Sequence, residues 1–304
     1  MKTNLPLNPD QLCLPNIDLI DSEQAFSDAF LKAAQILYQY FGQIKSAIED
    51  IKDFMREPFN FAIVGLFSKM CQNYYSYVLI EIHHDQIGSQ FLLENLSEAA
   101  ITLTYLLEEL DNSLFSEYIS ASVHQARYLL IDVEEELQKF PNHPDLLILR
   151  EQLEIFITKQ QEHVAERPLI VDSEAYLWGP QEADTTAKRG AVIGLNFLTN
   201  PARQIALKVV PASWLELQLS YSKSFAKSSR SNAKPGINFT DLRDAAHLCL
   251  HATQSLLQEV VDDLDVNNFP DIKRQQQLLN VLYEWFYKAH HVYQLHCSAK
   301  IQSY

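Results

Sequence analysis

The chain has 304 residues, of which 47% are apolar, so it has enough hydrophobic material for a substantial core. Its formal net charge of −15 repels phosphate backbones and anionic lipid, which argues against non-specific binding to nucleic acid or to a membrane surface. It contains only 7 glycines, and because sheets and tight hairpins use glycine at turns, this scarcity predicts helices rather than strands.

The predicted elements begin after a surface segment at residues 1–20. Apolar residues that recur every three or four positions predict a long amphipathic helix from about residue 21, with Asp21 and Ser22 as candidate N-caps, to Pro58. The segment at about 60–87 is apolar on nearly all sides, which predicts a central helix. Three further helices are expected at about 88–110, 113–140 and 144–165.

The pattern changes at residues 167–184, where two prolines and a glycine without helical periodicity predict a connecting loop. Shorter helices are expected from about 185 to 226, then an exposed loop at 227–238 and long helices at about 240–265 and 270–300. There is no internal repeat and no convincing pair of strands. The sequence thus predicts an all-α protein: a multi-helix up-down bundle at 21–166, with the C-terminal helices of 185–304 packed onto it in one continuous domain.

The four cysteines, Cys13, Cys71, Cys249 and Cys297, are far apart and form no C-x-x-C pair, so a thiolate zinc site is not predicted. Cys71 and Cys249 fall on apolar helical faces, where a reduced thiol packs as a small hydrophobic group. The N-terminus lacks the apolar core of a signal peptide, and no stretch reaches the roughly 18 apolar residues of a membrane span. We therefore expect a cytoplasmic protein without a membrane partner.

Two glutamates, Glu94 and Glu98, lie inside the third predicted helix on a face that they share with Phe91, Ile101 and Tyr105. The opposite face carries its own apolar stripe, so both faces are expected to be covered. A buried carboxylate needs a cation, several donors, a metal or a proton. One interpretation is a half-buried face on which the carboxylates reach water, Lys or Arg. The other is an internal polar pocket, with these candidate residues: Glu94, Glu98, Glu81, His84, Tyr105 and Ser220.

Two patterns are compatible with a divalent metal. Glu81-x-x-His84 precedes the glutamate pair, and carboxylate-bridged bundles combine such motifs with glutamates of neighbouring helices, although they use two motifs and this chain has one. At 240–265, Asp244, His247 and His251 project from one side, with the histidines within chelating reach of each other. That side is also the polar face, so a solvated surface is the other interpretation. Further histidines contribute only if the last helix lies alongside: His290, His291 and His296.

No acidic residue occurs between Glu216 and Asp241, although the chain is acidic as a whole. Four basic residues occur in this stretch: Lys223, Lys227, Arg230 and Lys234. They form either a soluble exposed loop or an anion-binding site for a phosphate or an acidic partner surface. The glycines that cradle phosphates in a P-loop or a dinucleotide site are missing.

Two stretches resemble the motifs of a bacterial all-helical family that is catalogued as a domain of unknown function: QFLLENLSEAAITLTYLL (90–107) and WLELQLSYSKSF (214–225). The family pattern has Arg-x-x-x-Glu in the first motif and Ser-x-x-x-His in the second. Glu98 and Ser220 match it, but Glu94 stands where Arg is usual and Ser224 stands where His is usual. The resemblance implies an all-helical cytoplasmic protein in which the Arg and the His of the pattern are replaced.

The same family is distantly reminiscent of HEPN-type helical nucleases, which carry Arg-x(4–6)-His on one helix. The nearest spacing in this chain is Arg243-x3-His247. The resemblance therefore implies an RNA-related ancestry in which the nuclease residues have been lost.

From the residues we expect a non-catalytic binding or interaction protein with an internal polar pocket around Glu94 and Glu98, without an assigned cofactor. The alternatives are a metal-dependent enzyme that uses the carboxylate and histidine candidates, or the RNA-related role. No glycine elbow frames a serine nucleophile. The ligand or protein partner is not identified by the sequence. A homodimer stays open, because four aromatic residues suit either a core or a dimer face: Tyr283, Trp285, Phe286 and Tyr287.

Overall fold

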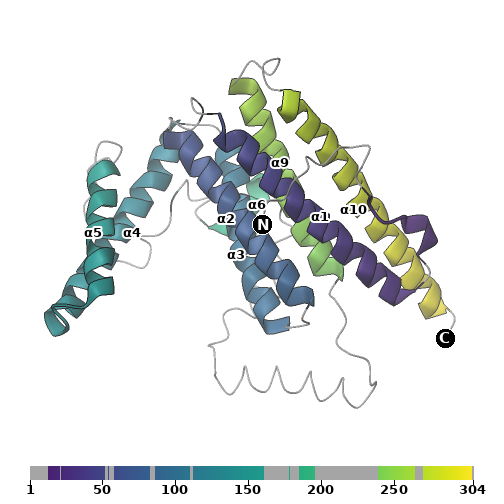
Figure 1. The fold of residues 1–304 in the computed structure, drawn as a ribbon, viewed down its shortest axis with the longest axis horizontal. Coiled ribbons are helices and arrows are strands. Elements are labelled where there is room, and N and C mark those ends of the chain that lie inside the picture. Colours follow the sequence, from purple (N-terminus) through teal and green to yellow (C-terminus); the bar gives the residue numbers. More distant parts are fainter. Residues whose placement is uncertain are drawn as a thin grey trace, which may run out of the picture. The chain divides into compact units, whose positions relative to one another are not determined.

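The computed structural model describes residues 13–20, 22–51, 54, 58–82, 86–109, 112–160, 178, 185–195, 239–263 and 270–302. Within these ranges every regular element is a helix (Figure 1), which confirms the all-α prediction. Among the described helices, none combines the length and the apolar character that crossing a bilayer requires. The elements are η2 (Ile17–Leu19), α1 (Glu23–Glu49), α2 (Pro58–Ile82), α3 (Gln86–Glu108), α4 (Asn112–Lys139), α5 (Pro144–Gln160), α6 (Thr186–Val192), α9 (Phe239–Asp263) and α10 (Pro270–Gln302).

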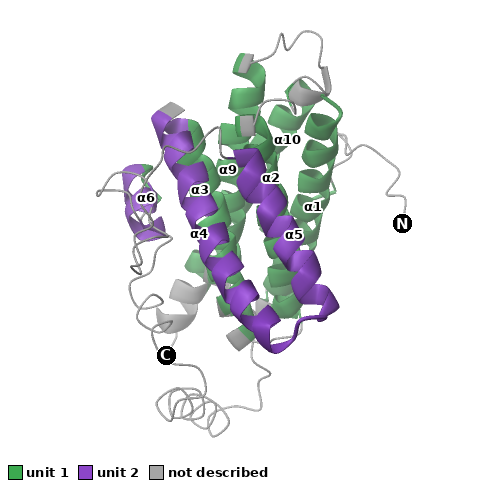
Figure 2. Cartoon of the chain, turned by 90° about the vertical axis from the view of Figure 1, so that its left-hand side faces the viewer, with its two compact units in different colours: residues 1–107, 193–304 green, residues 108–192 purple. Residues whose placement is uncertain are grey.

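The chain divides into two compact units (Figure 2). The first unit, residues 1–107 and 193–304, contains α1, α2, α3, α9 and α10, so the C-terminal helices do join the N-terminal ones. The second unit, residues 108–192, contains α4, α5 and α6. These boundaries differ from the predicted division at 166 and 185, because α4 and α5 pack against each other and belong to a unit of their own.

Helix α1 packs against α2, α9 and α10. The Ser22 hydroxyl accepts a hydrogen bond from the Ala25 N–H at 3.3 Å, so Ser22 is the N-cap of the two predicted candidates and satisfies one of the unpaired N–H groups at the helix start. Each fully buried Phe or Leu contributes about 1.5–3 kcal/mol by leaving water. The apolar stripe of α1 is buried throughout: Phe26, Phe30, Ala33, Leu37, Phe41, Ile44 and Ile48.

Helix α1 ends earlier than predicted. The Ile51 N–H bonds the Ile48 carbonyl at 3.0 Å, a tight turn that stops the helix at Glu49, and Pro58 opens α2 instead of ending α1. Helix α2 packs against α1 and α9, yet it is not covered on all sides. Phe61 is 66% exposed and Tyr75 is 43% exposed, so the predicted central position holds for only part of its circumference.

Helices α9 and α10 pack side by side in the first unit (Figure 1). Because α9 ends at Asp263 and α10 begins at Pro270, the two are consecutive and run antiparallel. The Tyr40 hydroxyl of α1 donates a hydrogen bond to the Gln275 carbonyl at 2.6 Å and so ties α1 to α10. Both helices bury an apolar face: Leu242, Ala246, Cys249, Leu256 and Val260 on α9, and Leu278, Leu282, Phe286 and Ala289 on α10.

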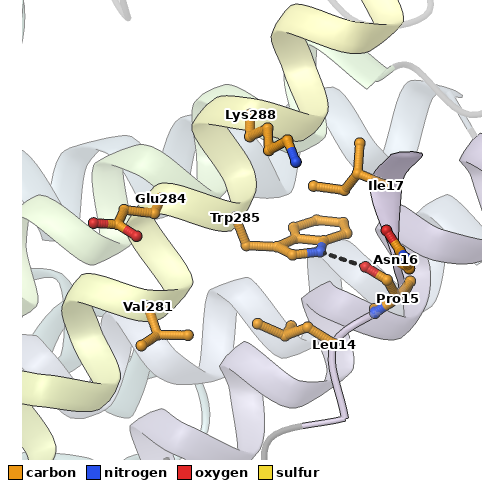
Figure 3. A pocket seen from close by; sticks show the side chains of 8 residues that line it. All are labelled: Leu14, Pro15, Asn16, Ile17, Val281, Glu284, Trp285 and Lys288. Atoms are coloured by element: carbon orange, nitrogen blue, oxygen red, sulfur yellow. Dashed lines mark hydrogen bonds between the residues drawn. The ribbon is translucent and has the colours of Figure 1, made fainter. Parts of the chain in front are cut away.

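Residues 13–20, the described part of the N-terminal segment that was expected to run over the surface, are anchored on α10. Ile17 is only 4% exposed. The Trp285 indole N–H donates to the Pro15 carbonyl at 2.9 Å (Figure 3), and Lys288 pairs with Asp18 at 2.9 Å. This segment therefore adds to the core of the first unit.

In the second unit, α4 and α5 form a helical hairpin around a small core of Val123, Ala126 and Ile157. The predicted connecting loop also contains a buried anchor, because Trp178 packs edge-on against Tyr118 with ring centroids 5.0 Å apart. The guanidinium carbon of Arg189 lies 4.0 Å from the centroid of a Trp178 ring. A cation over an indole is a favourable contact, which explains how this charged side chain is buried.

Replacing Tyr40 by Phe should lower the free energy of unfolding by about 1 kcal/mol, because it removes the hydroxyl but keeps the ring and leaves the Gln275 carbonyl without this donor. Urea unfolding measures the change. Tyr75→Phe removes a hydroxyl from a ring that is already exposed and serves as the matched control. Equal stabilities of the two variants would show that the hydrogen bond does not hold α1 to α10.

Candidate functional site

Glu94 and Glu98 point outward from α3. Both side chains are exposed, and Phe91 on the same face is 62% exposed. Ile101 and Tyr105, further along this face, are buried, so the face is covered over only one half of the helix. Partial burial, and then the neighbouring Glu98 carboxylate, raise the pKa of Glu94 above its usual range. The expectation of an internal polar pocket around these two carboxylates is therefore wrong.

Only two of the other residues of the expected pocket are among those that the structure describes. Glu81 at the end of α2 and Tyr105 on α3 are buried. His84 and Ser220 lie outside the described residues. The four basic residues of the predicted anion-binding loop also lie outside them: Lys223, Lys227, Arg230 and Lys234.

A second group of predicted residues does come together, on α9 and α10. The Arg243 guanidinium bonds Asp244 through Nε at 2.7 Å and also through Nη2, while its Nη1 meets Nε2 of His290 from α10. The His247 ring stacks on Tyr283, with centroids 5.3 Å apart and planes 11° from parallel. We call Arg243, Asp244, His247, Tyr283 and His290 the α9–α10 cluster.

The contact with Arg243 determines where His290 carries its proton. A guanidinium only donates hydrogen bonds, so Nε2 of His290 must be an acceptor and the proton must sit on Nδ1. That Nδ1 is buried and has no hydrogen-bond partner within the described structure, and the same is true of Nε2 of His247. Buried polar atoms are nearly always paired, so these two nitrogens mark a place where a partner is missing.

The two histidines of the cluster are uncharged near neutral pH. Burial, then Arg243, then His290 lower the pKa of His247 to about 4. Burial, and then Arg243 and His291, lower the pKa of His290. Arg243 and Asp244 are only 20% and 14% exposed at their side chains, so they form a largely desolvated ion pair. The cluster thus offers one positive charge, already balanced by one carboxylate, with hydrogen-bonding groups beside it.

The metal site predicted at Asp244, His247 and His251 is not supported. Asp244 faces Arg243, a cation that disfavours a metal ion, and His247 stacks on Tyr283. Within the residues that the structure describes, no three His, Cys, Asp or Glu side chains are arranged to hold a metal. The expected solvated surface is not observed either, because Tyr283 of α10 stacks on His247, and both His247 and His251 are half-buried.

An open pocket of about 260 Å³ lies between the N-terminal segment and α10 (Figure 3). Its lining includes Leu14, Ile17, Val281 and Trp285. The Trp285 N–H bonds the Pro15 carbonyl, and Lys288 pairs with Asp18. None of the described buried side-chain atoms that lack a hydrogen-bond partner belongs to this lining, whereas two belong to the α9–α10 cluster, which we take as the candidate site.

Comparisons with models of protein families, with curated proteins and with solved structures found no match. The chemistry of the site is therefore inferred from its own residues.

Arg243 and Tyr283 were not among the predicted site residues, and His290 was named only on condition that the last helix lies alongside. The signal that identifies them is geometric. In two consecutive antiparallel helices, residues equally far from the connection lie opposite each other, which pairs the region of Arg243 with that of His290 and the region of His247 with that of Tyr283.

Lowering the pH from 7.0 to 5.0 should destabilise the first unit through His247. The pKa of His247 is about 6.5 in the unfolded chain and about 4 in the folded chain. Between these two values the unfolded state binds a proton and the folded state does not, which favours unfolding. The stability is full above pH 6.5 and declines as the pH falls toward 4. Allowing for solvent screening, about 1 kcal/mol is lost by pH 5.0.

Urea unfolding at the two pH values tests this, because His247→Gln should lose less stability than the wild type between them. His143→Gln, which changes an exposed histidine of the second unit, is the matched control and should keep the wild-type pH dependence. The same loss in His247→Gln as in the wild type would contradict the role assigned to this ring.

Proposed function

We propose that the chain is a non-catalytic binding protein whose ligand carries an oxyanion, either a carboxylate or a phosphate, at the α9–α10 cluster. The position of Arg243 supports this most directly. Nη2 of Arg243 bonds Asp244 and Nη1 bonds His290. Because each of these terminal nitrogens carries two N–H groups, one N–H is left on each nitrogen. Two parallel N–H groups match the geometry of a carboxylate or phosphate edge.

The histidines add to this arrangement. The Nδ1–H of His290 is a donor without a partner on the side of the ring that faces away from Arg243, so a part of the ligand other than the oxyanion on Arg243 would accept from it. Nε2 of His247 donates to the same ligand when this nitrogen carries a proton. The negative charge of the ligand favours the protonated form of the His247 ring. The ligand thus completes hydrogen bonds that the folded chain leaves unmade.

Binding without catalysis is proposed because the cluster lacks the arrangement of a histidine base. Such a base is commonly oriented by a carboxylate, whereas Asp244 bonds Arg243. The pKa of His247, about 4, is also far from the near-neutral value that suits a general base.

A bacterial cytoplasm is the proposed location, in line with the resemblance noted above. Cys71 and Cys249 are free and buried, and burial raises the pKa of the Cys71 thiol to about 12, so it is held as an unreactive thiol. Alkylation of protein taken directly from cells should find these thiols reduced, and disulfides at these positions would contradict the location.

Replacing Arg243 by Gln should weaken the binding of inorganic phosphate and of acetate at least about tenfold, because a hydrogen bond to a charged group is worth about 1.5–3 kcal/mol. Isothermal titration calorimetry at pH 7 and low salt measures both anions. Lys273→Gln removes an exposed positive charge from α10 and is the matched control, with an expected change below about twofold.

Glu94→Gln and Glu98→Gln should also leave binding unchanged, because these side chains lie outside the cluster. A wild-type protein that binds neither anion, or a folded Arg243→Gln variant that binds both as well as the wild type does, would reject the proposal. Hydrolysis of phenyl phosphate that disappears in His247→Gln would reject its non-catalytic part.

An RNA-related role is the second candidate, and one contact favours it. Arg243 and His290 meet across two helices, with His247 one turn from Arg243, so arginine and histidine share one site without the Arg-x(4–6)-His spacing. A single-stranded RNA oligonucleotide should then bind in low salt, weaken steeply as salt rises, and lose affinity in Arg243→Gln. Absence of binding in 50 mM salt would exclude this role.

A further inference from the structure

A row of side chains on α10 follows the α9–α10 cluster. Tyr283, Tyr287 and His290 are spaced four and three residues apart, so they lie on one side of the helix. The two ends of this row contact α9, because Tyr283 stacks on His247 and His290 meets Arg243. Tyr287 lies between them along the helix and therefore borders the cluster.

Tyr287 is strongly exposed although it lies beside the interface between α9 and α10. It is 69% exposed, compared with 37% for Tyr283, and no described aromatic ring stacks on it. Trp285 and Phe286, its neighbours in sequence, are buried in the core. The side chain of Tyr287 thus presents a large aromatic surface to solvent at the edge of the cluster.

The spacing along α10 sets the size of a ligand that reaches both groups. Three residues of an α-helix rise by about 4.5 Å, which separates Tyr287 from His290 along the axis. The charged group of a small aryl phosphate is separated from its ring by a similar distance, and that of an aryl carboxylate by a shorter one. A small aryl oxyanion is therefore of a suitable size to lie along this row, with its charged group toward Arg243 and its ring toward Tyr287.

We infer that the oxyanion ligand of the α9–α10 cluster is aromatic, with its charged group on Arg243 and its ring stacked on Tyr287. Arg243 provides charge recognition, and Tyr287 distinguishes an aryl ligand from an alkyl ligand with the same charged group. Offset stacking of two rings is favourable beyond the area that it buries. This inference rests on the proposed function and adds the class of ligand to it.

The test compares two pairs of ligands that share a charged group: phenyl phosphate with methyl phosphate, and benzoate with acetate. In the wild type the aryl member of each pair should bind roughly three- to tenfold more tightly, as measured by titration calorimetry at pH 7. Tyr287→Leu should remove this preference and leave the affinity for methyl phosphate unchanged. Tyr287→Phe should keep the preference, because the ring and not the hydroxyl stacks.

Tyr75→Leu is the matched control, since Tyr75 is also an exposed tyrosine of the first unit but lies on α2. It should leave all four affinities unchanged. Equal binding of aryl and alkyl ligands in the wild type overturns the inference while the proposed function stands. An aryl preference that persists in Tyr287→Leu overturns the role of Tyr287. Failure of all four ligands to bind overturns the proposed function itself.

Discussion

The burial of the apolar face of α9 against its neighbours is the constraint on which the candidate site depends. Leu242, Ala246 and Cys249 are fully buried on one side of the helix, so the opposite side must carry its polar residues at the margin of the packing. Helix α10 covers part of that margin, and its register brings His290 to Arg243. A slip of one turn, about 5.4 Å, would separate them. The site is therefore a consequence of helix register.

The electrostatics of the cluster follow from its partial burial. A guanidinium that is only 20% exposed needs a partner, and Asp244 provides it from the neighbouring position in the chain. Burial and this positive charge together keep His247 and His290 neutral. In a chain with a net charge of −15, such a balanced group attracts few anions from a distance, so selectivity must come from short-range hydrogen bonds and ring contacts.

Periodicity predicted most of the helices because it reports how one segment presents its apolar residues. Ser22 as a cap and Pro144 and Pro270 as first residues were also readable, since each satisfies a local need of the backbone. The partner of each face was not readable. The apolar stripe of helix α4 is compatible with a multi-helix bundle and with a two-helix hairpin. The composition of the α3 face that holds Glu94 does not show whether another helix covers that face. Only tertiary packing decides such cases.

The same limit explains why the site was only partly predicted. Elsewhere on α9 a polar side chain is satisfied within the helix itself, because the Thr253 hydroxyl donates to the Cys249 carbonyl at 2.6 Å. The spacing of four residues makes this hydrogen bond predictable from the sequence. Nε2 of His247 and Nδ1 of His290 find no such partner. Tyr74 also buries an unpaired hydroxyl, but it lies among apolar and aromatic neighbours such as Phe41. Unmet hydrogen bonds beside a guanidinium, with exposed tyrosine next to them, are what distinguish a binding surface from an imperfection of the core.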